Sequence, residues 1–145
     1  MRRFDPKKFL PHREPILMLD ELQEVVPGQR AVGLKSLPLD CPLFQGHLPG
    51  NPILPGVFLI EGIAQAGAVM LLSSENPEGC PQEGSGRLVF VRNAKFRRPV
   101  LPEQTLSIEV ALVDESLPFY TIEGKVHVEG QCVAEASVVI TLAER

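Results

Sequence analysis

The sequence is short of the residues that mark disulfide-rich, zinc-binding or nucleic-acid-binding proteins. Its three cysteines, Cys41, Cys80 and Cys132, are an odd number, lie far apart and form no C-x-x-C pair. This spacing argues against a disulfide framework and against a zinc site. Fourteen Lys and Arg against eighteen Asp and Glu leave a formal charge of -4, which gives no reason to expect nucleic acid or an anionic membrane as a partner. We therefore expect no metal and no cofactor, and a reducing cytoplasm as the location.

Long apolar runs are also missing. The first residues carry positive charge but no apolar stretch follows them, so we expect no secretory signal. The most apolar segment, residues 57–72, contains Glu61 and Gln65 and is shorter than the roughly 20 residues that span a bilayer. With 145 residues, 44% of them hydrophobic, the chain is expected to form one soluble domain, residues 1–145, around a single core.

What the sequence does contain is a series of strand-like segments. Residues 16–26 and 30–37, separated by Pro27-Gly28, predict a hairpin. Four further strands are predicted at residues 87–98, 104–113, 118–128 and 131–142. Because short breaks separate these four, we expect them to pair in chain order as an antiparallel meander. Residues 73–86, rich in Gly, Glu, Ser and Pro, predict a mobile surface loop.

One long helix is predicted between the hairpin and the meander, from about Pro55-Gly56 to Leu72. Apolar side chains surround its axis, which is typical of a helix buried on every side. One curved sheet covers only part of such a helix, so we infer that a second copy of the chain covers the rest, as in a homodimer. The expected fold class is α+β, with an antiparallel sheet around one buried central helix.

The loop before this helix carries the first candidates for chemistry. Residues 45–57 hold three prolines and three glycines, a composition that can fix His47 in place and aim N–H groups outward from the helix start. Glu61 follows within the helix among apolar neighbours, where burial would raise the pKa of its carboxyl and suit it to act as a general acid. Each residue alone also has a structural interpretation, His47 as a turn residue and Glu61 as a carboxylate that reaches solvent or pairs with a base.

The other two histidines are weaker candidates. His12, in Pro11-His12-Arg13, is expected to pack or to hydrogen-bond before the first strand. His127 lies on a polar strand face with Glu123 and Lys125, so we expect it to be exposed to solvent.

Motifs spread over residues 9–142 link these candidates. They are Leu10-Pro11-His12-Arg13-x-Pro15 with Leu19-Asp20, Gly46-His47-x-Pro49-Gly50-x-Pro52-Ile53-x-Pro55-Gly56-Val57, Glu61 with Gln65, and Lys95-Phe96-Arg97-Arg98-Pro99-Val100. With them the sequence resembles the bacterial 3-hydroxyacyl-[acyl carrier protein] dehydratases of type II fatty-acid synthesis, which have the hot-dog fold. In that family the helix acid is Asp in members that also isomerise the double bond and Glu in members that only dehydrate, so Glu61 resembles the second branch.

The resemblance implies a hydro-lyase that converts a (3R)-3-hydroxyacyl thioester to the trans-2-enoyl product. His47 would remove the 2-proton, Glu61 would protonate or activate the leaving hydroxyl, and the Gly56 N–H would polarise the carbonyl. Gln65, one turn beyond Glu61, would orient its carboxylate. Phe58, Ile60 and Phe90 are candidates for the apolar lining of the acyl chain, with ordinary core packing as the alternative interpretation.

The resemblance also implies partners. The substrate would be carried by phosphopantetheine on an acyl carrier protein, and because carrier proteins are acidic, a local basic cluster is the expected docking surface. That cluster comprises Arg92, Lys95, Arg97 and Arg98, for which a solvated strand face is the alternative interpretation. The family takes His and Glu from opposite subunits, so a homodimer would be needed for catalysis, and the family favours a trimer of dimers.

Two departures from the family pattern concern the loops near the substrate. Pro102-Glu103-Gln104 stands where Pro-Gly-Asp is usual, and Tyr120 is the only tyrosine, so the family's gating tyrosine has no evident counterpart.

Two other functions stay open, a hot-dog acyl thioesterase and a non-catalytic acyl-carrier-binding module. Acyl-chain length and the pathway served, housekeeping or specialised, also stay open.

Overall fold

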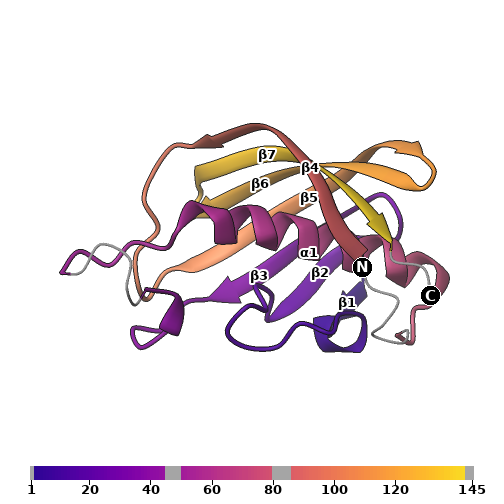
Figure 1. Cartoon of the computed structure of the whole chain (residues 1–145). Coiled ribbons are helices and arrows are strands. Elements are labelled where there is room, and N and C mark those ends of the chain that lie inside the picture. Colours follow the sequence, from indigo (N-terminus) through magenta and orange to yellow (C-terminus); the bar gives the residue numbers. More distant parts are fainter. Residues whose placement is uncertain (1, 45–49, 80–85, 143–145) are drawn as a thin grey trace.

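The computed structural model describes residues 2–44, 50–79 and 86–142. They form a seven-stranded antiparallel sheet with the long helix α1 (Gly56–Glu75) packed across one face (Figure 1). The strands are β1 (Arg2–Phe4), β2 (Glu21–Val26), β3 (Arg30–Ser36), β4 (Gly86–Phe96), β5 (Thr105–Ser116), β6 (Phe119–Val128) and β7 (Gln131–Leu142). Two short 3-10 helices, η1 (Pro6–Lys8) and η2 (Pro42–Phe44), lie in the connections. The predicted α+β arrangement, a sheet around one central helix, is confirmed.

Alternation of residue types explains why α1 packs on one face of the sheet. Along β5, Leu106, Ile108 and Val110 are buried, whereas Thr105 and Glu109 are exposed. Successive side chains of a strand point to opposite faces, so this pattern gives the sheet one apolar face. The helix covers that face and contacts β5, β6 and β7 most extensively.

Glycine lets the helix approach β6 closely. A Cβ at Gly124 would collide with the side chain of Ile63 on α1, and Ile63 is completely buried. A Cβ at Gly62 would lie 2.9 Å from Cδ1 of Ile108 on β5. A side chain at either position would push the two layers apart. These contacts determine which turn of α1 lies over the sheet, and Glu61 is the neighbour of Gly62.

The strand order differs from the predicted four-strand meander. The order in the sheet is β1-β2-β3-β5-β6-β7-β4. Strands β5, β6 and β7 pair in chain order as expected, but β4 pairs with β7 and not with β5. The connection between β4 and β5 instead passes around one end of the sheet (Figure 1). Periodicity identifies a strand but not its neighbour, and the short break after β4 was a misleading guide.

The helix is largely buried within a single chain, contrary to the reasoning behind the predicted second copy. Ile60, Ile63 and Met70 are all buried. The irregular segment of residues 9–19 also covers α1, and the backbone of Ile16 and of Met18 is hydrogen-bonded to Gln65 on the helix. The helix also extends to Glu75 rather than Leu72, so it is long and apolar enough to cross a bilayer by length and composition alone, but most of it is buried inside the fold. The predicted loop of residues 73–86 therefore starts later, and its residues 80–85 lie outside the described part of the chain.

Strand β4 forms an edge of the sheet and carries apolar side chains that the chain itself leaves open. Leu88, Val89, Phe90 and Phe96 are between 42% and 53% exposed. An edge strand presents unpaired N–H and C=O groups, and exposed apolar side chains along it favour pairing with another chain.

Candidate active site

Glu61 lies on the side of α1 where the segment before β2 crosses the helix. Its Oε2 accepts a hydrogen bond of 2.8 Å from Nε2 of Gln65, one turn further along α1. Nε2 of His12 lies 3.4 Å from the same oxygen. The side chains of Glu61 and His12 are 28% and 23% exposed. The structure therefore brings a half-buried carboxylate between an amide and an imidazole.

Gln65 is buried and uses both ends of its amide. Its Oε1 accepts a hydrogen bond of 2.7 Å from the backbone N–H of Met18, and its Nε2 donates to the carbonyl of Ile16 at 2.9 Å. Because a backbone N–H can only donate, Oε1 must face Met18 and Nε2 must face Glu61. The amide orientation is thus determined by the backbone, and Gln65 presents a donor to the carboxylate.

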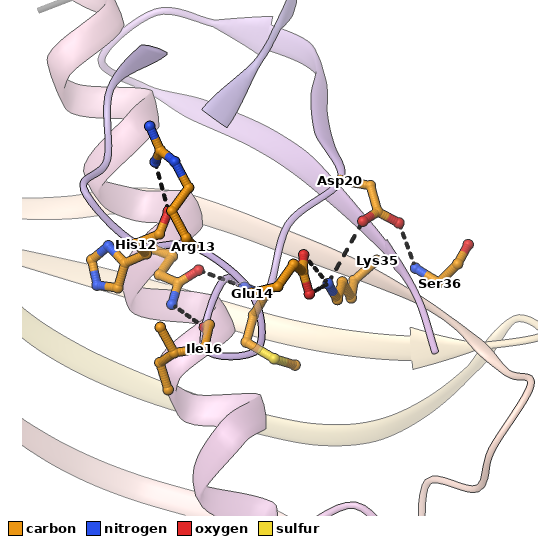
Figure 2. A network of polar contacts seen from close by, with 9 residues as sticks. His12, Arg13, Glu14, Ile16, Asp20, Lys35 and Ser36 are labelled. Atoms are coloured by element: carbon orange, nitrogen blue, oxygen red, sulfur yellow. Dashed lines mark hydrogen bonds and ion pairs between the residues drawn. The ribbon is translucent and has the colours of Figure 1, made fainter. Parts of the chain in front are cut away.

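The segment that carries His12 is tied to β3 by ion pairs (Figure 2). Nζ of Lys35 lies 3.1 Å from the Glu14 carboxylate and 3.7 Å from that of Asp20, and the Lys35 side chain is only 4% exposed. The Arg13 guanidinium donates a hydrogen bond of 2.7 Å to the His12 carbonyl. These contacts hold the segment in place beside the helix.

The pKa of Glu61 is lowered, which contradicts the predicted rise. Burial is the largest single influence and does raise the pKa, but the hydrogen bonds from His12 and Gln65 and the positive charge of His12 together lower it by more. The apolar neighbours of Glu61 are visible in the sequence, whereas the imidazole comes from a distant segment. The Glu61 carboxylate is therefore ionised at neutral pH in the free protein.

Among the other predicted site residues, the structure describes Gly56, Phe58 and Phe90 but not His47. His47 belongs to residues 45–49 and lies outside the described part of the chain. Gly56 begins α1, and the absence of a Cβ there makes room for the Phe96 ring, which would lie 2.8 Å from such an atom. Phe58 is partly buried against the core, and Phe90 is exposed on β4.

The cavity beside Glu61 is small in this single chain. Its volume is about 30 Å³, roughly the share of one water molecule in the liquid. It is lined by Leu10 and His12, by α1, by residues 86–88 of β4 and by Ile140 of β7. Neither Phe58 nor Phe90 belongs to this lining, so the expected acyl lining is not assembled here. A much larger groove, about 670 Å³, lies on the outer face of the sheet and does not include Glu61.

The predicted basic cluster lies along β4 and just beyond it. Arg92 and Lys95 face Ser137 and Glu135 of β7, and the Arg92 guanidinium lies 5.2 Å from the centre of the Phe90 ring. Arg97 forms an ion pair of 2.8 Å with Glu135. Part of the positive charge of the cluster is therefore neutralised within the chain.

The two other histidines are partly buried. His12 makes a polar contact, which was one of the two expectations for it, and its partner is Glu61 on α1. The only signal for this partner in the sequence was the place of His12 in the Leu10-Pro11-His12-Arg13 motif. His127 is 25% exposed rather than fully exposed, with Oε2 of Glu109 4.0 Å from its Nδ1. That Nδ1 is buried and has no hydrogen-bond partner among the described residues.

Comparison with known proteins places these features in a family. Residues 10–137 match the model of the FabA-like domain. The chain is 39% identical to the 3-hydroxyacyl-[acyl-carrier-protein] dehydratase FabZ of Geotalea uraniireducens, over 95% of this chain and 94% of that protein. It is 44% identical to the FabZ of Enterococcus faecalis, over 91% of each.

Solved structures with the same fold are more distant in sequence. The dehydratase heterocomplex ApeI:P from Xenorhabdus doucetiae has a TM-score of 0.80 at 20% identity and covers 99% of this chain and 94% of its own. A hypothetical thioesterase with coenzyme A from Streptococcus pneumoniae has a TM-score of 0.62 at 12% identity, over 86% and 85%. These likenesses concern the fold. The family match over residues 10–137 and the identities to the FabZ proteins together show that the chain belongs to the FabA-like domain family.

Proposed function

We propose that this protein is a hydro-lyase that dehydrates (3R)-3-hydroxyacyl-[acyl carrier protein] to the trans-2-enoyl form in fatty-acid biosynthesis. The names of its relatives, at 37% to 44% identity over most of the chain, support this reaction. The observation that carries the proposal within the chain is Glu61, held at the side of the central helix by Gln65 and next to His12. We further propose that residues 1–145 form one hot-dog domain.

The reaction requires a base, an acid and a donor. A hydrogen on the carbon next to a thioester is weakly acidic, and we assign its removal to His47 and polarisation of the carbonyl to the Gly56 N–H at the helix start. The electron pair of the broken C–H bond forms the new double bond, and the C3–O bond breaks. Glu61, once it has received a proton, gives that proton to the departing hydroxyl, so that water leaves. Gln65 keeps the Glu61 carboxylate in position.

A homodimer is part of this proposal. The cavity beside Glu61 is far too small for an acyl chain, and residues 86–88 of the exposed edge strand β4 line it. A second copy paired along β4 would cover Val89 and Phe90 and bring partner residues next to Glu61. Burial of the central helix does not support the dimer, whereas the open edge of β4 does. A trimer of such dimers is the larger assembly that we consider.

We propose that an acyl carrier protein, bearing the substrate on phosphopantetheine, docks on the basic cluster of Arg92, Lys95, Arg97 and Arg98. Arg97 is paired with Glu135, so Lys95 and Arg98 are expected to contribute more. Lys95→Glu and Arg98→Glu should weaken carrier-protein binding, and binding should weaken as salt rises, because the attraction is between exposed charges. Isothermal titration calorimetry measures both effects, with Arg30→Glu on β3 as a matched control. Binding that is insensitive to salt and to Arg98→Glu would exclude this surface.

We place the protein in the cytoplasm. Cys41 and Cys132, the cysteines in the described part of the chain, are free thiols, as expected in a reducing compartment.

To test the reaction, purified protein is incubated with 3-hydroxyacyl-[acyl carrier protein], and the mass of the acylated carrier protein is measured by mass spectrometry. We expect a product lighter by one water molecule. Glu61→Gln should reduce the rate on the order of 10² to 10⁴ while circular dichroism shows an intact fold. Release of the acyl chain as a free acid would instead indicate a thioesterase, and no change with several chain lengths would indicate a binding module.

A further inference from the structure

His12 reaches the Glu61 carboxylate from a different part of the chain. Its Nε2 lies 3.4 Å from Oε2 of Glu61, whereas its Nδ1 is buried without a hydrogen-bond partner among the described residues. A protonated imidazole carries a proton on each ring nitrogen. The Nε2 proton points toward the carboxylate, and a ring that has given up this proton is neutral and keeps the proton on Nδ1.

The two contacts on Glu61 also select one oxygen. Both Gln65 and His12 approach Oε2. Within the described part of the chain, Oε1 accepts no hydrogen bond, so it is the oxygen that a bound hydroxyl can reach. One oxygen is thus held by the protein and the other is available for substrate.

Few other charges face this pair. The small cavity is bounded by Gln65 and apolar residues of α1, by Ile140 of β7 and by residues 86–88 of β4. Arg87 of β4 is the further charged residue in the described lining. The Arg13 guanidinium, next to His12 in the chain, donates to backbone carbonyls. Among the described residues, His12 is therefore the titratable proton donor in contact with Glu61.

We propose that His12 is a positioning residue of the dehydration, which holds the Glu61 carboxylate at Oε2 and supplies the proton that Glu61 delivers to the departing hydroxyl. This inference rests on the proposed function. Protonated His12 passes the proton on its Nε2 to the Glu61 carboxylate and becomes neutral. As the C3–O bond breaks, the departing oxygen takes that proton from Glu61, which is then ionised again. The 2-proton goes to the base, water leaves, and His12 is reprotonated from solvent. An ionised Glu61 carboxylate has no proton of its own to give, so His12 supplies the proton.

The test compares the pH profiles of kcat and KM for wild type, His12→Gln, Glu61→Gln and the double variant. His12→Gln should lower kcat on the order of 10² with KM unchanged. Its remaining activity should shift to lower pH, because Glu61 must then carry its own proton. The double variant should be as slow as Glu61→Gln alone, since His12 acts through Glu61. Losses that multiply in the double variant, or a pH profile that keeps its wild-type shape, would overturn the role of His12.

Two further measurements guard against a merely structural effect. His127→Gln, at a histidine on β6 that does not line the cavity beside Glu61, should leave kcat unchanged. His12→Asn should reproduce the pH shift of His12→Gln. Carbon-13 NMR of the Glu61 carboxyl should show a higher pKa in His12→Gln, because burial stays while the His12 contact is lost. If the enzyme is active but the pKa of Glu61 is the same with and without His12, the role of His12 is excluded and the proposed function stands. If the protein dehydrates no acyl carrier substrate, both the proposed function and the role of His12 are excluded.

Discussion

At Glu61, burial and hydrogen bonding act on the pKa in opposite directions. Burial favours the protonated carboxyl, whereas Gln65 and His12 favour the ionised one and prevail. In the proposed role of general acid, Glu61 therefore has to receive a proton before it can give one in each turnover. A single residue is thus both half-buried and charged, and its behaviour depends on two neighbours.

The lowered pKa of Glu61 makes stability depend on pH. Ionised Glu61 stabilises the folded state fully above the ordinary carboxyl pKa of 4.5, and this contribution is lost as pH falls through the lower pKa of the folded state. We therefore expect the melting temperature of wild type, relative to Glu61→Gln, to fall as the pH is lowered below about 4.5. Calorimetry at neutral and acidic pH measures this difference, with exposed Glu123→Gln as the control. A difference that stays constant with pH would contradict the expectation.

The sequence predicted Glu61 and Gln65 as site residues, but it did not predict the contact between Glu61 and His12. Glu61 stood out because an acid among Leu59, Ile60 and Ile63 is unusual, and Gln65 because it lies one helical turn away. The partner His12 could not be found by spacing, because only the folded chain brings its segment beside α1. Protonation depends on such contacts, so the direction of the pKa shift was predicted wrongly.

At the element scale, α1 and β6 approach because Gly124 has no side chain. Gly124→Val should lower the free energy of unfolding by about 1–3 kcal/mol, because the added methyl groups collide with buried Ile63. Urea denaturation measures the loss. Glu123→Ala, an exposed change on the same strand, should stay within about 0.5 kcal/mol of wild type. If Gly124→Val lowered the free energy of unfolding no more than Glu123→Ala does, α1 and the sheet could separate at little cost.

Strand identity was predictable and strand pairing was not. The alternation of Leu106, Ile108 and Val110 with polar residues is a local property, so it predicted β5 from the sequence. The neighbour of β4 is decided by how the whole sheet closes over the helix. Gly124 illustrates the same limit, because a glycine in a strand only suggests a close approach, whereas the structure identifies Ile63 as the group that approaches.

At the scale of the whole molecule, the open edge of β4 predicts a homodimer in which two copies pair along this strand. Phe90→Glu should place like charges near each other across a two-fold axis, so the protein should become monomeric and lose activity while keeping its fold. Sedimentation velocity, circular dichroism and the dehydration assay measure these outcomes together. Val113→Glu, at a residue of β5 that is 50% exposed, is the matched control and should stay dimeric. A wild-type monomer, or a dimeric Phe90→Glu variant, would contradict pairing along β4.

The position of β4 in the sheet has a consequence for how the protein is made. Its partner within the chain is β7, the last of the described strands, so β4 leaves the ribosome well before β7 exists. Throughout that interval an apolar strand has no partner in the nascent chain and is open to aggregation or to chaperones. Synthesis is therefore the period when this protein most needs protection, and slow translation of residues 97–142 would lengthen it.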